Sequence, residues 1–199
     1  MPTPTTSWLG FVTTEEYRAN PQAMNDELRE LATAAGCRRV YHGVQHEDPE
    51  FGYLVPMWPS AEARKAARES KDDADHQALL ASKVGVIGEA MGVDFESNPS
   101  PVFEAGIVEV AMMELNEGKT AADVAPYLNE IIATKGVGIV AGTWGTSDQN
   151  ERRLVLVVGW ESLAAHQTAV AGATDSLKAA MASIQDIGTL KVNHVKLYH

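Results

Sequence analysis

Three side chains of the sequence could transfer protons in an apolar setting. Glu109, His42 and His194 each lie in a stretch of apolar and β-branched residues that is typical of a strand. A carboxylate among apolar side chains has a raised pKa and can act as an acid or a base. A neutral imidazole beside a bound phenol or an activated C–H bond can act as a general base. We therefore predict that these three are the catalytic residues.

Strand alternation predicts which way these side chains point. In residues 107–113, we assign the wholly apolar row that begins at Val108 to the face that packs on helices, and the row with Glu109 to an internal cavity. In the last strand, the same reasoning places His194 and Tyr198 on the cavity side. The predicted cavity therefore holds a carboxylate, an imidazole and a phenol.

Aromatic side chains could hold a flat ligand in this cavity. An indole ring can form one wall, and tyrosine hydroxyls can donate hydrogen bonds to polar groups of the ligand. The predicted substrate-binding residues are Trp144, Tyr198, Tyr41 and Tyr53. The partner that we expect is a small hydrophobic or aromatic molecule.

Each candidate also has a structural alternative. Glu109 could reach solvent or an arginine from a strand edge, and His194 could be a structural or solvated residue at a rim. His42 and Trp144 could be satisfied residues of the core. His166 lies in a predicted helix, and we expect it to be solvated or to cap the helix.

Several motifs of metal and phosphate sites are absent. The sequence has no HExxH, no CxxC, no GxSxG and no glycine-rich phosphate loop. Its six histidines do not stand at ligand spacings such as i, i+4, so we predict no metal and no cofactor. Haem on a single histidine stays open, because residues distant in sequence can meet in the fold.

The composition is that of an acidic globular protein. Its 199 residues are 45% hydrophobic and carry a net charge of −11, which excludes a nucleic-acid-binding surface. The single cysteine, Cys37, excludes an intrachain disulfide and favours a reducing compartment. No signal-peptide pattern or membrane-spanning apolar run is visible, so we expect a cytoplasmic protein without a membrane partner.

The elements that would position the candidates occur twice. One apolar helical face with the spacing i, i+4, i+7, i+8 begins at Met24 and again at Val124. Further along, Trp58 and Trp160 each end an apolar stretch and stand two residues before a serine and an alanine-rich segment. The shared order and spacing indicate an internal duplication.

Each copy predicts the order βαββαβ, the ferredoxin-like arrangement. In the second copy, the predicted elements are a strand at 103–115, a helix from an N-cap at Asp123 to Gly136, a hairpin of 137–144 and 152–160, a helix capped by Ser162, a helix at 175–186 and a strand at 190–199. In the first copy, they are a strand at 7–17, a helix opened by Asn20 and Pro21 and a hairpin around 45–50. The position of its last strand stays open, with 92–96 as the candidate, and a linker follows at 97–101. Pro56 lies within the first hairpin and predicts a sheet edge or a bulge there.

The sequence therefore predicts an α+β fold of two tandem ferredoxin-like halves, residues 1–98 and 99–199. A sheet with helices on a single face leaves its other face bare, and two such sheets can cover each other. We expect the halves to form an intrachain dimeric α+β barrel with the ligand cavity between the sheets. A homodimer of the whole chain stays open, since the fused pair already satisfies the usual dimer interface.

Two motifs resemble those of a known superfamily. The first is a strand ending in Trp160, then Ser162, then His166 on the next helix; the second is the hairpin sequence YHGVQHEDP at residues 41–49. Both are similar to the dimeric α+β barrel superfamily, and more narrowly to its antibiotic-biosynthesis-monooxygenase-like branch in the tandem form common in fungal proteins. The first half departs from the pattern, because Arg64 stands where His166 stands in the second.

The resemblance implies a ligand-binding barrel of a superfamily with diverse chemistry. Its members include cofactor-free monooxygenases, haem-degrading enzymes, polyketide cyclases, lyases and small stress proteins. We expect a small cofactor-independent enzyme of monooxygenase, cyclase or lyase type, acting in secondary metabolism on an aromatic or polyketide-like molecule. The alternative is a non-catalytic small-molecule-binding or stress-response barrel protein, and haem turnover is a third reading.

Overall fold

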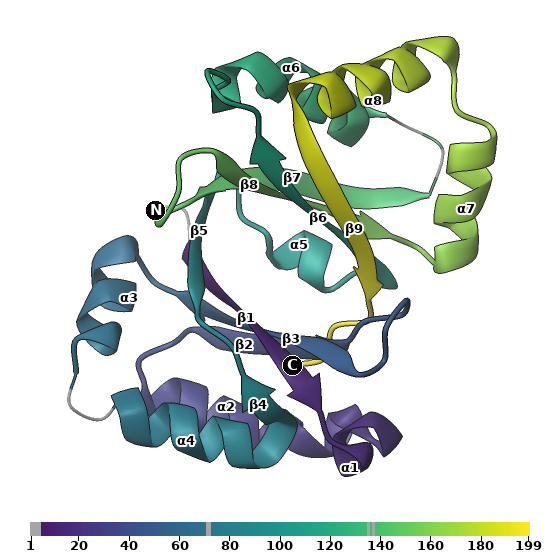
Figure 1. Cartoon of the computed structure of the whole chain (residues 1–199). Coiled ribbons are helices and arrows are strands. Elements are labelled where there is room, and N and C mark those ends of the chain that lie inside the picture. The colour runs from purple at the N-terminus through teal and green to yellow at the C-terminus, as the bar shows by residue number, and fades with distance from the viewer. Residues whose placement is uncertain (1–4, 71–72, 135, 137) are drawn as a thin grey trace. The chain divides into compact units, whose positions relative to one another are not determined.

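The protein is described by a computed structural model, which places residues 5–70, 73–134, 136 and 138–199. The chain divides into two compact units (Figure 1). The N-terminal unit comprises Met1–Asp94 together with Val195–His199, and the C-terminal unit comprises Phe95–His194. Within the described residues, no helix is long and apolar enough to cross a membrane.

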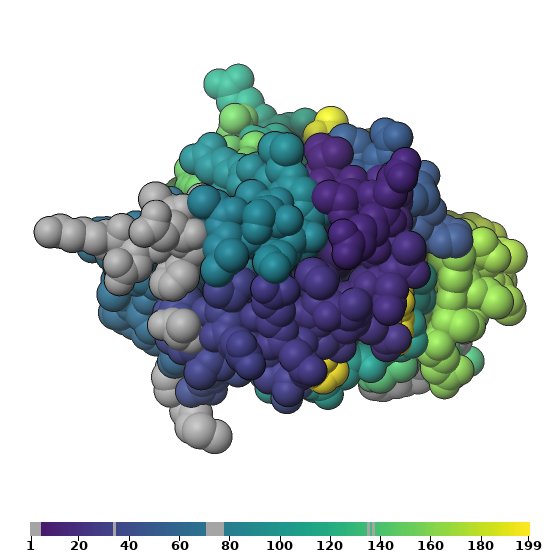
Figure 2. All heavy atoms as spheres, turned by 90° about the horizontal axis from the view of Figure 1, so that it is seen from below, coloured from purple at the N-terminus to yellow at the C-terminus, as the bar shows by residue number. Residues whose placement is uncertain are grey.

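The N-terminal unit is an antiparallel sheet covered by helices. Its elements are β1 (Thr5–Thr13), α1 (Glu15–Ala19), η1 (Pro21–Met24), α2 (Asn25–Ala34), β2 (Arg39–Val44), β3 (Phe51–Trp58), α3 (Ala61–Arg68), α4 (Asp73–Val84), β4 (Gly85–Ile87) and β5 (Met91–Phe95). The strands lie in the order β2-β3-β1-β5, and the short β4 also pairs with β1. Helices α1 and α2 form part of the surface of this unit that is seen in Figure 2.

The C-terminal unit repeats this arrangement. Its elements are α5 (Ser100–Phe103), β6 (Ile107–Leu115), α6 (Ala121–Ala133), β7 (Ile139–Ser147), β8 (Arg153–Trp160), α7 (Leu163–Ala171), α8 (Asp175–Ile187) and β9 (Gly188–Val195). The strand order β7-β8-β6-β9 matches β2-β3-β1-β5 of the first unit. The core lies between one face of this sheet and the helices α6, α7 and α8. The predicted fold class, α+β with two tandem ferredoxin-like halves, is confirmed.

Equivalent residues of the two units pair in the same register. Thr5 pairs with Trp58 in the first unit, and Ile107 pairs with Trp160 in the second. The serine two residues after each tryptophan caps the following helix and accepts a hydrogen bond from the backbone N–H three residues on. The repeated Trp–x–Ser sequence therefore ends a strand and begins a helix in both units.

Several predicted boundaries change in the structure. The predicted strand 7–17 ends at Thr13, before α1, and the predicted strand 103–115 begins at Ile107, after α5. Helix α6 begins after Thr120, not after Asp123, which is the third residue of a capping box and accepts a hydrogen bond from the Thr120 backbone N–H at 2.8 Å. That bond lowers the pKa of the Asp123 carboxyl. Strand β9 ends at Val195, short of the predicted 199. The predicted linker at 97–101 runs into α5, which begins at Ser100.

The predicted sheet edge at Pro56 is wrong. Strand β3 pairs with β1 on one side and with β2 on the other, so it is an inner strand. Its pairing with β1 passes from Thr6↔Met57 to Leu9↔Leu54 and so omits Pro56. Proline has no backbone N–H to give to a ladder, and the interruption on one side accommodates it inside the sheet. The last strand predicted for this half, residues 92–96, is confirmed as β5.

The capping box predicts a measurable loss of stability on Thr120→Ala. Thr120→Ala removes the hydroxyl that donates to the Asp123 carboxylate at 2.8 Å within this box, so the free energy of unfolding should fall by about 1 kcal/mol in urea titration. Thr168→Ala, within α7 at an exposed position, is the control and should change it by less than about 0.5 kcal/mol. Equal losses in the two variants would contradict the role given to Thr120.

Candidate functional site

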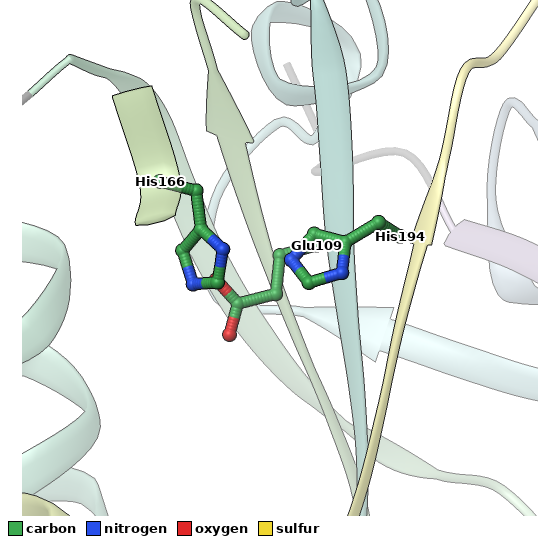
Figure 3. Close-up of side chains that lie close together, drawn as sticks. All are labelled: Glu109, His166 and His194. Carbon is green, nitrogen blue, oxygen red and sulfur yellow. The ribbon is translucent and has the colours of Figure 1, made fainter. Parts of the chain in front are cut away.

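Two histidines and a glutamate meet in the C-terminal unit (Figure 3). Glu109 comes from β6, His166 from α7 and His194 from β9. The His166 Nε2 atom lies 3.5 Å from Glu109 Oε2, and the two imidazole ring centres are 4.5 Å apart. One nitrogen or oxygen atom from each residue lies within 4.8 Å of the others. The structure thus joins two predicted catalytic residues, Glu109 and His194, with His166, which the sequence analysis expected to be solvated or to cap its helix.

The Trp–x–Ser motif positions two of the three side chains. The indole N–H of Trp160 donates to Glu109 Oε2 at 2.9 Å and so orients the carboxylate. Ser162 starts α7, and the backbone N–H of His166 donates to the Ser162 carbonyl one turn later at 3.1 Å. The rings of Trp160 and His166 then meet edge to face at 4.8 Å. One short segment therefore places both the carboxylate partner and the imidazole.

An apolar pocket of about 150 Å³ adjoins the cluster. It lies between the sheet and the helices of the C-terminal unit, and apolar side chains form most of its wall, among them Leu128 of α6, Ile184 of α8 and Val192 of β9. Of the described residues that line it, Glu109 and His166 are the ionisable ones. A dry cavity of about this size holds one benzene-sized ring. The pocket is therefore large enough to enclose one aromatic ring, and it has a carboxylate and an imidazole on its wall.

The predicted faces of β6 and β9 are wrong. Glu109 and Ala111 line the pocket under the helices, and Val192 and His194 lie on the same face of β9 by alternation. The prediction took the wholly apolar row of β6 as the helix-packing one. The carboxylate is tolerated on that side because the Trp160 indole and His166 contact it.

His166 is the functional candidate that the sequence reasoning missed. We expected it to be solvated or capping, but its side chain is only 16% exposed and packs against Glu109 and His194. A signal was present. His166 stands three residues before Ala169, which is buried on the inner face of α7, so helical periodicity places it on that inner face.

His42 lies in the N-terminal unit, where both of its ring nitrogens form hydrogen bonds with other side chains. Nδ1 is 2.7 Å from the Tyr17 hydroxyl and Nε2 is 2.9 Å from Asn25 Oδ1. The amide oxygen can only accept, so Nε2 carries the proton and Nδ1 accepts from Tyr17. Burial, with a smaller effect of His199, lowers the pKa of His42 to about 4. These contacts explain a neutral structural histidine, and its predicted role as a base stays a prediction.

The four predicted substrate-binding residues lie elsewhere than on the wall of this pocket, as far as the described residues define it. Trp144 packs in the core of the C-terminal unit. Tyr41 and Tyr53 are buried in the N-terminal unit, and Tyr198 pairs through its backbone with His42. Their contribution to ligand binding stays a prediction.

The N-terminal unit carries different chemistry at the matching positions. Arg64 stands on α3 where His166 stands on α7; it donates to the Thr6 carbonyl at 3.0 Å and lies 3.3 Å from Asp94. The indole of Trp58 donates to the Ser7 hydroxyl at 3.0 Å, as that of Trp160 donates to Glu109. This unit has its own apolar pocket, of about 240 Å³. The two units thus share the arrangement of strands and helices, but the cluster of Glu109, His166 and His194 lies in the second unit.

Comparison with solved structures supports the fold. The chain is similar to a proposed monooxygenase from Fusobacterium nucleatum subsp. nucleatum, with 12% sequence identity and a TM-score of 0.69 over 100% of this chain and 94% of that one. It is similar to an anthrone oxidase-like protein, with 12% sequence identity and a TM-score of 0.69 over 99% of this chain and 92% of that one. It is also similar to a proposed monooxygenase from Lactobacillus acidophilus NCFM, with 13% sequence identity and a TM-score of 0.62 over 98% of this chain and 94% of that one. Neither a family model nor a curated protein matches the sequence. At these identities the likeness establishes a shared monooxygenase-like fold, over nearly the full length of each chain.

Proposed function

We propose that this protein is a cofactor-independent, monooxygenase-like enzyme that acts on a small hydrophobic aromatic molecule. The observation that carries the proposal is the meeting of Glu109, His166 and His194 beside an apolar pocket in one unit. The fold shared with proposed monooxygenases supports the reaction class. The apolar wall supports the ligand class, because such surface gains free energy by covering an aromatic ring.

The residues divide the chemistry between them. His166 lines the pocket and accepts a proton from a phenol or from a C–H bond activated by the aromatic system. Glu109, 3.5 Å from it, stabilises the imidazolium that forms, and its own orientation is held by Trp160. The His194 ring packs against His166 at a tilt of 45° and positions it. The base is therefore held by groups from three different secondary-structure elements.

The reaction balances with O₂ as the oxidant. A ring CH₂ loses its first proton to His166, and the resulting carbanion gives its electrons to O₂ and forms a C–O bond. Cleavage of the O–O bond, with loss of the second hydrogen, leaves C=O on the ring and releases one water. A 150 Å³ pocket encloses about one ring, so a larger substrate inserts its reactive ring and leaves the rest outside.

Oxygen uptake tests this proposal. Protein freed of metals with EDTA is mixed in air with small aryl ketones that carry an activated ring CH₂ and with anthrone, the latter suggested by the description of one structural neighbour. We expect O₂ consumption and carbonyl product in equal amounts. Val192→Trp should abolish both, because Val192 lines the pocket, whereas Val140→Trp, another exposed valine on a strand of this unit, should not. Binding of these compounds without O₂ uptake would instead support a non-catalytic binding protein.

Three broader assignments belong to the same proposal. The resemblance to tandem fungal-type proteins and a place in secondary metabolism rest on the sequence motifs described above. A cytoplasmic location rests on the use of a single cysteine, Cys37. Each would be supported by identification of the natural substrate and of the cell that makes it.

A further inference from the structure

We propose that Glu109, His166 and His194 form a binding site for a divalent transition-metal ion such as Zn²⁺ or Co²⁺. Two imidazoles and one carboxylate are a donor set that binds zinc and non-haem iron in proteins, with remaining positions open to water or substrate. The sequence spacing gave no sign of this site, because each ligand comes from a different element and the smallest separation, from His166 to His194, is 28 residues.

The distances between the donor atoms fit a shared ion. Ligands about 2.1 Å from a tetrahedral metal lie about 3.4 Å from each other. His166 Nε2 and Glu109 Oε2 are 3.5 Å apart, which matches that separation without rearrangement. All three donor atoms lie within 4.8 Å of one another, so a shift of at most about 1.4 Å by the third side chain would complete the set.

The surroundings favour an ion at this position. The His166 and Glu109 side chains are 16% and 17% exposed, and His194 is 7% exposed, so the ligands are largely shielded from water. The Trp160 indole N–H donates to the Glu109 carboxylate, as second-layer donors do around metal ligands. The carboxylate offsets part of the ion's charge, and the net charge of −11 attracts cations to the chain.

Metal binding and the proposed base chemistry would compete. A bound ion takes the imidazole lone pair that accepts the substrate proton, so the loaded protein should lose the proposed O₂ uptake. This consequence rests on the proposed function, whereas binding itself does not. A divalent metal ion would then inhibit the enzyme by binding the same side chains that carry out the proposed reaction.

Titration of the EDTA-treated protein with Co²⁺ tests the site, since cobalt on nitrogen ligands absorbs visible light. We expect one ion per chain, displacement by Zn²⁺ and no displacement by Mg²⁺, which prefers oxygen ligands. His166→Gln, His194→Gln and Glu109→Gln should each weaken binding by at least about tenfold. His46→Gln, on the exposed turn between β2 and β3, is the matched control and should bind as the wild type does. Circular dichroism of each variant verifies its fold.

The outcomes separate this proposal from the function proposed above. Absence of cobalt absorption up to millimolar concentration, or unchanged affinity in folded His166→Gln and His194→Gln variants, would overturn the metal site. Cobalt binding by a protein without O₂ uptake on any compound would leave the site standing and remove the enzymatic function. O₂ uptake that resists EDTA and is inhibited by Zn²⁺ in the wild type supports both.

Discussion

Replacing His166 with alanine is expected to lower kcat for the proposed oxygenation by about 100-fold or more, with a small change in KM. General bases contribute about 10²–10⁴-fold to the rates of proton transfer. His166 lines the pocket and has the Glu109 carboxylate as its counter-ion. The variant loses the proton acceptor but keeps the apolar wall, and that is why binding should survive the change better than turnover.

Steady-state O₂ uptake at several substrate concentrations separates kcat from KM. His46→Ala serves as the control for loss of a histidine, because His46 lies on an exposed turn. His194→Ala tests a residue that was predicted from the sequence and should also lower kcat, because it removes the ring that packs against His166. If either folded variant turns over as fast as the wild type, the replaced histidine has no role in the reaction.

Replacing His42 with glutamine is expected to flatten the pH dependence of stability between about pH 6.5 and pH 4. Burial lowers the pKa of His42 to about 4 in the folded chain, against about 6.5 when unfolded. In this window the unfolded chain binds a proton that the folded chain does not, so stability falls as the pH falls. A shift of this size corresponds to about 3 kcal/mol once the pH is below 4.

Urea unfolding of wild type and His42→Gln at several pH values between 7 and 4 measures this effect. The wild-type advantage at pH 7 should shrink by up to about 3 kcal/mol towards pH 4. The titratable groups named around His42 are Tyr17, Tyr198 and His199, and all three are unchanged in the variant. A constant difference between the two proteins across this range would show that His42 is not held neutral by the fold.

The order of strands and helices could be predicted from the sequence because similar patterns occur in both halves of the chain and can be compared. The repeated helical face from Met24 and Val124, and the repeated Trp–x–Ser, each had a second copy to compare with. These patterns predicted the βαββαβ order of both units and the strand at 92–96. Errors arose where one copy departs from the other, as at Pro56, which is an inner-strand proline with no counterpart in the other hairpin.

The site was harder to predict because its parts are far apart in the sequence. Glu109 and His194 were found from their apolar neighbours, but alternation gives two faces without saying which one meets the helices. His166 was noticed as part of the Trp160–Ser162–His166 motif but was not predicted as a site residue, because an alanine-rich helix has no clear apolar face to show which way it points. Only its contact with the Trp160 indole and the Glu109 carboxylate shows that it faces inwards.

A crystal structure of the protein soaked with a small phenol would decide whether this cluster is the working site. We predict that the aromatic ring lies in the pocket of the C-terminal unit, with its oxygen within hydrogen-bonding distance of His166 or Glu109. A phenol bound elsewhere, with this pocket empty and Glu109, His166 and His194 out of its reach, would contradict the proposed function at its foundation.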